Sequence, residues 1–153
     1  MGALRDLTGK VAWITGAGTG IGQAGALSLS RAGMQVILSG RRADKLAETA
    51  EMIRDVGGKP VIEALDIVDA DQVASVAGRI SETFGRLDVA VFSAGMNIRE
   101  RAWDKVGPEG WTSVVEADLN GAFYCCHSVL PMMRKQQQGL IINVASWAGV
   151  RPS

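Results

Sequence analysis

Short apolar runs alternate with helix-like segments along the whole chain, and this alternation limits the possible folds more than any other feature of the sequence. The runs are continuously apolar, which is typical of strands buried on both faces of a parallel sheet. Strict alternation with right-handed crossovers predicts a doubly wound α/β fold with five parallel strands in the order 3-2-1-4-5. The expected strands are 11–15, 35–39, 60–65, 87–92 and 140–145.

Helix signals fill the segments between the expected strands. The clearest signal is a set of apolar residues that recur at helical spacing from Val73 to Phe84, with Gly85 directly after them. A complete fold of this kind has at least one further strand, so the chain is expected to be incomplete at its C-terminus. The expected helices are 21–32, 44–56, 71–84 and a long segment from Gly107-Pro108 to about Arg134.

Composition argues against several classes of function. The 153 residues carry 16 basic and 16 acidic side chains, and a net charge of zero gives no general attraction to nucleic acid or to an anionic membrane. The apolar runs are too short to span a membrane, and the first ten residues lack the apolar core of a secretory signal. Cys125 and Cys126 are adjacent and His127 is the only histidine, so neither a disulfide nor a metal site is expected. We therefore expect a cytoplasmic protein without a metal, a nucleic-acid partner or a membrane span.

A glycine-rich segment lies where the first strand passes into the first helix. Glycines let the backbone approach a pyrophosphate closely, and the following helix directs unpaired N–H groups at the phosphates. The flanking strand and helix make the motif much more specific than an isolated glycine cluster, although a turn without a ligand is the alternative. We expect a single dinucleotide-binding, Rossmann-like domain over residues 1–153, truncated after its fifth strand. The expected cofactor contacts here are Gly16, Gly18, Thr19, Gly20, Ile21 and Gly22.

Two arginines after the second strand bear on the choice of cofactor. The end of this strand usually approaches the adenosine ribose, where a carboxylate suits the 2′-hydroxyl of NAD and an arginine suits the 2′-phosphate of NADP. Gly40 precedes Arg41 and Arg42, and no acidic residue occupies this position. NADP is therefore predicted in preference to NAD, and the alternative is that the two arginines form a solvated turn.

Several motifs together resemble the short-chain dehydrogenase/reductase family. The glycine segment 15–22 is similar to its cofactor motif, Asp66 is similar to its acid that contacts adenine, and Ala94-Gly95 resembles the end of its Asn-Asn-Ala-Gly motif. Segments 111–121 and 139–149 match the next two motifs in order, so the resemblance covers essentially the whole chain. It implies hydride transfer between NADP(H) and a small-molecule carbonyl or secondary alcohol. It also implies that the full-length protein is a homo-oligomer.

The resemblance also implies two catalytic positions. Ser146 matches the serine that holds the substrate oxygen by hydrogen bonding. Asp118 stands where the family has an active-site asparagine, and its charge would alter the proton-relay water expected there. Phe92-Ser93 replaces the two asparagines of the Asn-Asn-Ala-Gly motif, which puts one side-chain amide contact in doubt but keeps the backbone turn.

The general acid of the family is a tyrosine followed four residues later by a lysine, which lowers the tyrosine pKa from its usual value of about 10. The only tyrosine here is Tyr124, and Ser128 stands at that spacing, so Tyr124 is interpreted as a packing residue. Two interpretations remain open. The chain is the cofactor-binding part of an oxidoreductase that a C-terminal part completes, or it is at most an inactive dinucleotide-binding module or a non-functional truncated product. Residues 1–153 alone are expected to be inactive, because the tyrosine–lysine pair is missing, and poorly soluble, because the fifth strand would form an exposed apolar edge.

Overall fold

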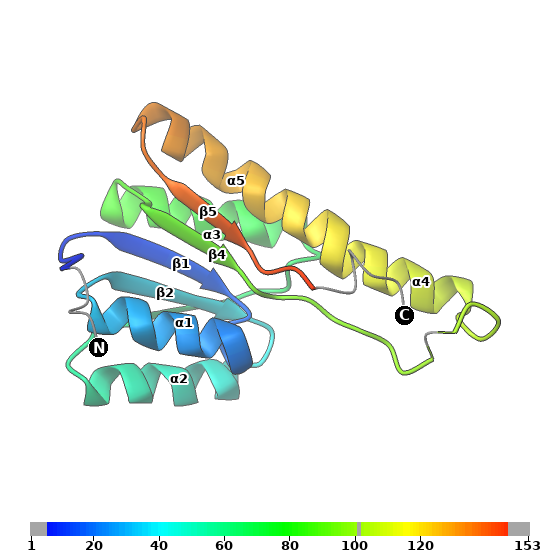
Figure 1. The fold of residues 1–153 in the computed structure, drawn as a ribbon. Coiled ribbons are helices and arrows are strands. Elements are labelled where there is room, and N and C mark those ends of the chain that lie inside the picture. The colour runs from blue at the N-terminus through cyan, green and yellow to red at the C-terminus, as the bar shows by residue number, and fades with distance from the viewer. Residues whose placement is uncertain (1–5, 101, 147–153) are drawn as a thin grey trace.

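The computed structural model describes residues 6–100 and 102–146 of the chain (Figure 1). In this part, five parallel strands form one sheet in the order β3-β2-β1-β4-β5, which confirms the predicted topology. β1 lies at the centre, and its Ile14 stands between Leu38 of β2 and Val91 of β4. The strands are β1 (Val11–Thr15), β2 (Gln35–Gly40), β3 (Val61–Ala64), β4 (Val89–Phe92) and β5 (Leu140–Asn143).

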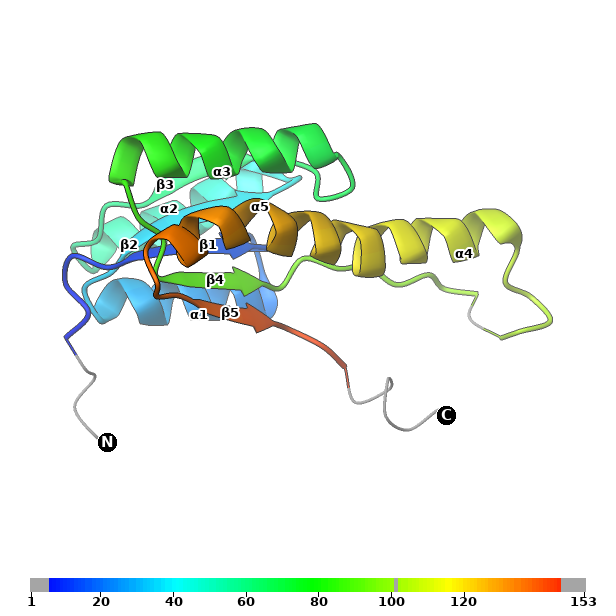
Figure 2. The same cartoon turned by 90° about the horizontal axis from the view of Figure 1, so that it is seen from above.

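Helices lie on both faces of the sheet, as Figure 2 shows from above. Two pack on one face, two lie on the other, and a shorter helix extends beyond the C-terminal ends of the strands (Figure 1). Parallel strands require such crossover connections, and the helices bury the central strands on both faces. The first pair is α1 (Gly20–Arg31) and α2 (Ala43–Asp55), the second is α3 (Ala70–Phe84) and α5 (Gly121–Lys135), and the shorter helix is α4 (Pro108–Val115).

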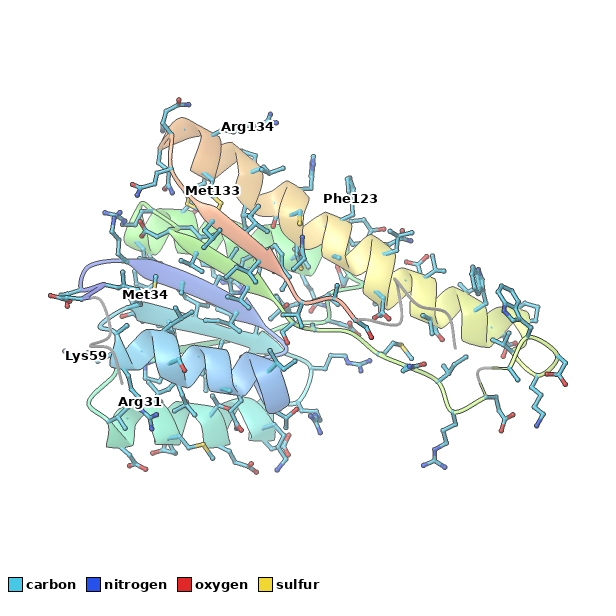
Figure 3. The ribbon with its side chains drawn as sticks, in the orientation of Figure 1. Arg31, Met34, Lys59, Phe123, Met133 and Arg134 are labelled. Carbon is cyan, nitrogen blue, oxygen red and sulfur yellow. The ribbon has the colours of Figure 1, made fainter. Side chains whose placement is uncertain are left out.

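The two faces of the sheet carry separate apolar cores, and Trp13 of β1 belongs to the core under α3 and α5. Its ring meets the ring of Phe92 edge to face at a centroid distance of 5.8 Å. Its Nε1 donates to Ser39 Oγ at 2.8 Å. Trp13 therefore joins β1 to both neighbouring strands. Further along this face, Met133 points from α5 toward the sheet, whereas Phe123 points away from it (Figure 3).

The edge strands are less buried than the central strands, which differs from the prediction for β3 and agrees with the exposed apolar edge expected for β5. β1 is wholly buried and β2 and β4 nearly so, but β3 alternates between half-buried and exposed residues. In β5, the exposed fraction is 53% for Leu140 and 42% for Ile142. Among the described helices, none makes more than a marginal contact with β5, which explains why its apolar side chains remain accessible.

The long helix expected from Gly107 to about Arg134 is not uniform. α4 ends at Val115, a π-helical turn follows at Glu116–Asn120 (η1), and α5 continues from Gly121. A π turn winds more loosely than an α turn, so it changes the direction in which the following side chains point. η1 contains Asp118, one of the predicted site residues, so the direction of its carboxylate depends on this turn.

A buried carboxylate joins the N-terminal ends of two strands. Asp88 Oδ2 accepts from the Val11 N–H at 2.9 Å and from Arg86 Nε at 2.8 Å, while Lys10 Nζ lies 3.2 Å from Oδ1. Burial alone would raise the pKa of the Asp88 carboxyl, but the hydrogen bonds from Arg86, Val11 and Lys10 hold that pKa below its usual range. The ionised carboxylate therefore stabilises the start of β1 beside β4.

Asp88→Asn should lower the free energy of unfolding at neutral pH by about 1.5–3 kcal/mol, the usual contribution of hydrogen bonds to a charged group. The pKa of Asp88 is lowered in the folded protein, so this stabilisation is present above the unfolded pKa of about 3.9 and is lost as pH falls below it. Urea unfolding at several pH values measures the difference. Asp55→Asn, at an exposed position, is the matched control and should change stability by less than about 0.5 kcal/mol. A difference that does not depend on pH would contradict this assignment.

Candidate functional site

A cavity of about 800 Å³ lies at the C-terminal ends of the central strands. Its walls come from the segments that follow β1, β2, β3 and β4, and from α4 and η1. In open α/β sheets, ligands bind in the crevice outside the carboxyl ends of the strands, where successive crossovers leave on opposite faces of the sheet. This cavity occupies that position, between β1 and β4.

The glycine segment forms one wall of the cavity through close backbone packing. Gly16 has a φ of 66° and Gly20 a φ of 60°, in the left-handed region that favours glycine. A Cβ on Gly16 would lie 2.7 Å from the Ala94 nitrogen, and a Cβ on Gly22 would lie 2.3 Å from the Gly16 oxygen. By contrast, no atom lies within 4 Å of a Cβ placed on Gly20. Packing within the protein therefore requires Gly16 and Gly22, whereas Gly20 keeps the space before α1 open.

Hydrogen bonds to neighbouring elements hold the glycine segment in place. The Ala17 N–H donates to the Ser39 oxygen of β2 at 3.1 Å. Thr49 Oγ1 of α2 lies 3.0 Å from the Ala17 oxygen, and Gln23 Nε2 donates to the same hydroxyl at 3.0 Å. The first N–H groups of α1 have no acceptor within the helix, so they face the cavity from a fixed position.

Positive charge gathers where β2 ends. Arg41 places its Nη1 4.0 Å from Asp66 Oδ2, and Arg42 donates from Nη2 to Thr19 Oγ1 at 3.2 Å. All four of these side chains line the cavity, together with Gly40. Arg42 thereby joins the turn after β2 to the glycine segment, while Arg41 lies closer to the segment that follows β3.

The loop after β4 forms the next wall, and a carboxylate holds it. The Ala94 N–H donates to Thr15 Oγ1 at 3.3 Å, and the Met96 N–H donates to Asp118 Oδ1 at 2.8 Å. A Cβ on Gly95 would lie 3.0 Å from the same Asp118 oxygen. The contact needs an acceptor oxygen, which an aspartate supplies as well as an asparagine does.

The structure brings most of the predicted site residues to this one cavity. Gly22 is not among the lining residues, and its contact with Gly16 explains why a glycine stands there. Asp118 and Ser146 also lie outside the described lining, although Asp118 binds the Met96 N–H and Ser146 follows the lining residue Val144 by two positions. The predicted residues that line the cavity are Gly16, Gly18, Thr19, Gly20, Ile21, Arg41, Arg42, Asp66, Ala94 and Gly95.

The helical side of the cavity was missed from the sequence. Ser113, Glu116 and Ala117 line it, and Ile67 and Val68 line it after β3. Glu116 and Ala117 follow Ser113 by three and four residues, so both lie on the same helix face as Ser113. This spacing was a usable signal. Which face turns toward the cavity depends on the π turn, and the sequence pattern did not indicate that turn.

Other reactive groups lie away from the cavity. Burial, with a smaller contribution from Cys126, raises the pKa of the Cys125 thiol to about 12, so this thiol stays protonated near neutral pH. Tyr124 is partly buried and packs against the core under α3 and α5. Among residues 6–100 and 102–146, no cluster of three His, Cys, Asp or Glu side chains could hold a metal ion. The helices in these ranges are too short or too polar to cross a membrane.

Comparison with known proteins identifies the family. The family model of the short-chain dehydrogenases matches residues 10–153. The chain belongs to this family. It is 36% identical over 146 residues to an uncharacterised oxidoreductase of Staphylococcus saprophyticus, and the match covers 94% of this chain and 62% of the relative. The chain therefore spans less than two thirds of the length of that relative.

Solved structures of other oxidoreductases have the same fold. A metagenomic short-chain oxidoreductase in complex with NADP is 32% identical, with a TM-score of 0.92, over 97% of this chain and 67% of that one. An NAD⁺-bound xylitol dehydrogenase is 27% identical, with a TM-score of 0.93, over 97% of this chain and 57% of that one. The chain thus belongs to a family of NAD(P)-dependent oxidoreductases, and family membership alone does not determine which of the two cofactors fits its cavity.

Gly20→Val should weaken cofactor binding by about tenfold or more, because its branched side chain would occupy the open space before the first turn of α1. Gly85→Val is the matched control. Gly85 has a φ of 68°, has no atom within 4 Å of an added Cβ, and lies outside the cavity lining. Both variants carry similar backbone strain, about 1–2 kcal/mol. Titration calorimetry with NADP⁺ and NAD⁺ compares them, and equal affinities in the two variants would show that the glycine segment does not hold the phosphates.

Proposed function

We propose that this chain is the cofactor-binding part of an NADP-dependent oxidoreductase that transfers a hydride between NADP(H) and a carbonyl or secondary alcohol. One observation carries the proposal. A single cavity is lined by the glycine segment with the N-terminus of α1, and by two arginines at the end of β2, where the sequence carries no acidic residue. The bound nicotinamide supplies or accepts the hydride. The residues of this chain bind the cofactor and orient it.

The open space at Gly20 fits a pyrophosphate. A Cβ there would meet no protein atom, although the same segment is tightly packed at Gly16 and Gly22. The first turn of α1 contributes unpaired N–H groups and the positive end of the helix dipole, both of which favour an anion. Tight packing on either side of one open position supports the assignment of a phosphate, rather than a side chain, to that space.

The turn after β2 fits a 2′-phosphate better than a ribose hydroxyl. Guanidinium groups form bidentate, charge-assisted hydrogen bonds with phosphate oxygens, and these are about twice as strong as neutral hydrogen bonds. Arg42 is already held toward the glycine segment by its bond to Thr19 Oγ1. Arg41, whose side chain is 65% exposed, remains able to turn toward a phosphate. This difference in charge and position supports NADP over NAD.

The substrate side of the proposal rests on Ser146 and Asp118. Ser146 would hold the substrate oxygen, while Asp118 Oδ1 would keep the loop after β4 in place by accepting from the Met96 N–H. Tyr124 does not suit the role of general acid, because it packs against the core and Ser128 stands where a lysine would be needed. The position of Tyr124 also favours a second candidate function for residues 1–153, that of a dinucleotide-binding module without catalytic activity.

Residues 1–153 alone should not reduce ketones with NADPH, because general acid catalysis contributes about 10²–10⁴-fold and Ser146 is too weak an acid to replace it. NADPH oxidation with a panel of ketones is the assay, and Tyr124→Phe is the control that keeps the packing but removes the hydroxyl. Turnover that disappears in Tyr124→Phe would contradict the packing role of Tyr124. A protein as long as its relatives should be active, and binding of NADPH without turnover in that protein would favour the second candidate.

Arg41→Ala should weaken NADP⁺ binding by about ten- to a hundredfold and leave NAD⁺ binding within about twofold, because only NADP⁺ brings a phosphate to this position. Arg54→Ala removes the same charge near the other end of α2 and should leave both affinities unchanged. Titration calorimetry measures the two dissociation constants. Equal losses for the two cofactors, or a parent protein that binds NAD⁺ more tightly, would rule out the proposed preference.

A further inference from the structure

We propose that Asp66 competes with the 2′-phosphate of NADP for Arg41, and so limits how strongly the site discriminates NADP from NAD. The inference rests on the proposed cofactor preference and assigns one determinant of it. Its basis is the pair formed by Arg41 Nη1 and Asp66 Oδ2, which lie 4.0 Å apart. Both side chains line the cavity, and their short separation allows a phosphate beside Arg41 to lie close to Asp66 as well.

The segment after β3 fixes the direction of the Asp66 carboxylate. The Val68 N–H donates to Asp66 Oδ1 at 3.3 Å, and the Asp66 N–H donates to Gln72 Oε1 at 3.2 Å. One carboxylate oxygen therefore belongs to a local turn, and the other faces Arg41. The turn presents this oxygen to Arg41 without any rearrangement of the chain.

The two arginines differ in how they are held. Arg42 is hydrogen-bonded to the neutral hydroxyl of Thr19, whereas Arg41 faces a negative charge. The Arg41 side chain is 65% exposed, and exposed ion pairs stabilise proteins only slightly. A phosphate monoester with a charge of about −1.5 to −2 therefore displaces the single charge of Asp66 from Arg41. NADP loses part of its affinity in this exchange, and NAD, which brings no phosphate to Arg41, loses none.

Asp66→Asn tests this competition, because the amide oxygen keeps the bond from the Val68 N–H while the charge facing Arg41 is lost. Titration calorimetry with NADP⁺ and NAD⁺ gives the ratio of the two dissociation constants, and this ratio should shift toward NADP by about two- to fivefold. Any contact between Asp66 and the adenine is common to both cofactors and cancels in the ratio. Asp55→Asn removes the same charge at the far end of α2 and should leave the ratio unchanged.

The same substitution in an Arg41→Ala background shows whether the effect acts through Arg41. There Asp66→Asn should no longer shift the ratio. Asp66→Ser, whose hydroxyl can also accept from the Val68 N–H, should shift the ratio in the same direction as Asp66→Asn in the parent, and it serves if the amide variant folds poorly.

An unchanged ratio in both Asp66 variants, or an equal shift with and without Arg41, overturns the proposal. The parent ratio tests the NADP preference separately, since a parent that prefers NAD can still show the predicted shift.

Discussion

The close approach of the glycine segment to the loop after β4 is the contact on which the whole site depends. A Cβ on Gly16 would lie 2.7 Å from the backbone nitrogen of Ala94, so only glycine allows these two turns to meet. They meet because β1 and β4 are neighbours in the sheet although β2 and β3 separate them in the sequence. In the same loop, the Met96 N–H donates to the Asp118 carboxylate, and this bond fixes the position of η1 relative to the loop after β4. The wall of the cavity between β1 and β4 thus follows from strand order and one glycine.

The chain as a whole has no net charge, so any attraction for an anionic cofactor comes from the few charged side chains at the cavity. Arg42 is held toward the glycine segment, and Arg41 lies beside Asp66, which lines the same cavity. Within a few ångströms, the site therefore contains both a group that attracts a phosphate and a group that opposes it. The proposed competition lowers the affinity for NADP and leaves the affinity for NAD unchanged, so it sets how far the site discriminates between the two cofactors.

Patterns with a fixed period predicted much of this structure. The continuous apolar run around Ile14 indicated a central parallel strand, and β-α alternation then gave the sheet order. The glycine spacing also indicated where the cavity lies. It did not separate the roles of Gly22 and Gly20, because the first depends on contact with Gly16 and the second on open space, and both are three-dimensional facts.

Features that depend on tertiary contacts were not predicted. The π turn at Glu116–Asn120 interrupts a segment whose residues are all compatible with a regular helix. The bond from the Met96 N–H to Asp118 joins two segments whose relation the sequence does not specify. The periodicity of apolar residues predicts the helices and strands, whereas tertiary packing determines which of their faces are in contact.

Backbone amide chemical shifts, followed by NMR during titration with NADP⁺ and then with NAD⁺, test the central claim most directly. Both cofactors should move the amide signals of Gly16 to Gly22 and of Ala94 to Met96, because both carry the pyrophosphate. Only NADP⁺ should move the signals of Arg41 and Arg42 strongly, because only it carries the 2′-phosphate. Shifts confined to residues outside the cavity, or identical shifts of Arg41 and Arg42 with the two cofactors, would contradict this account.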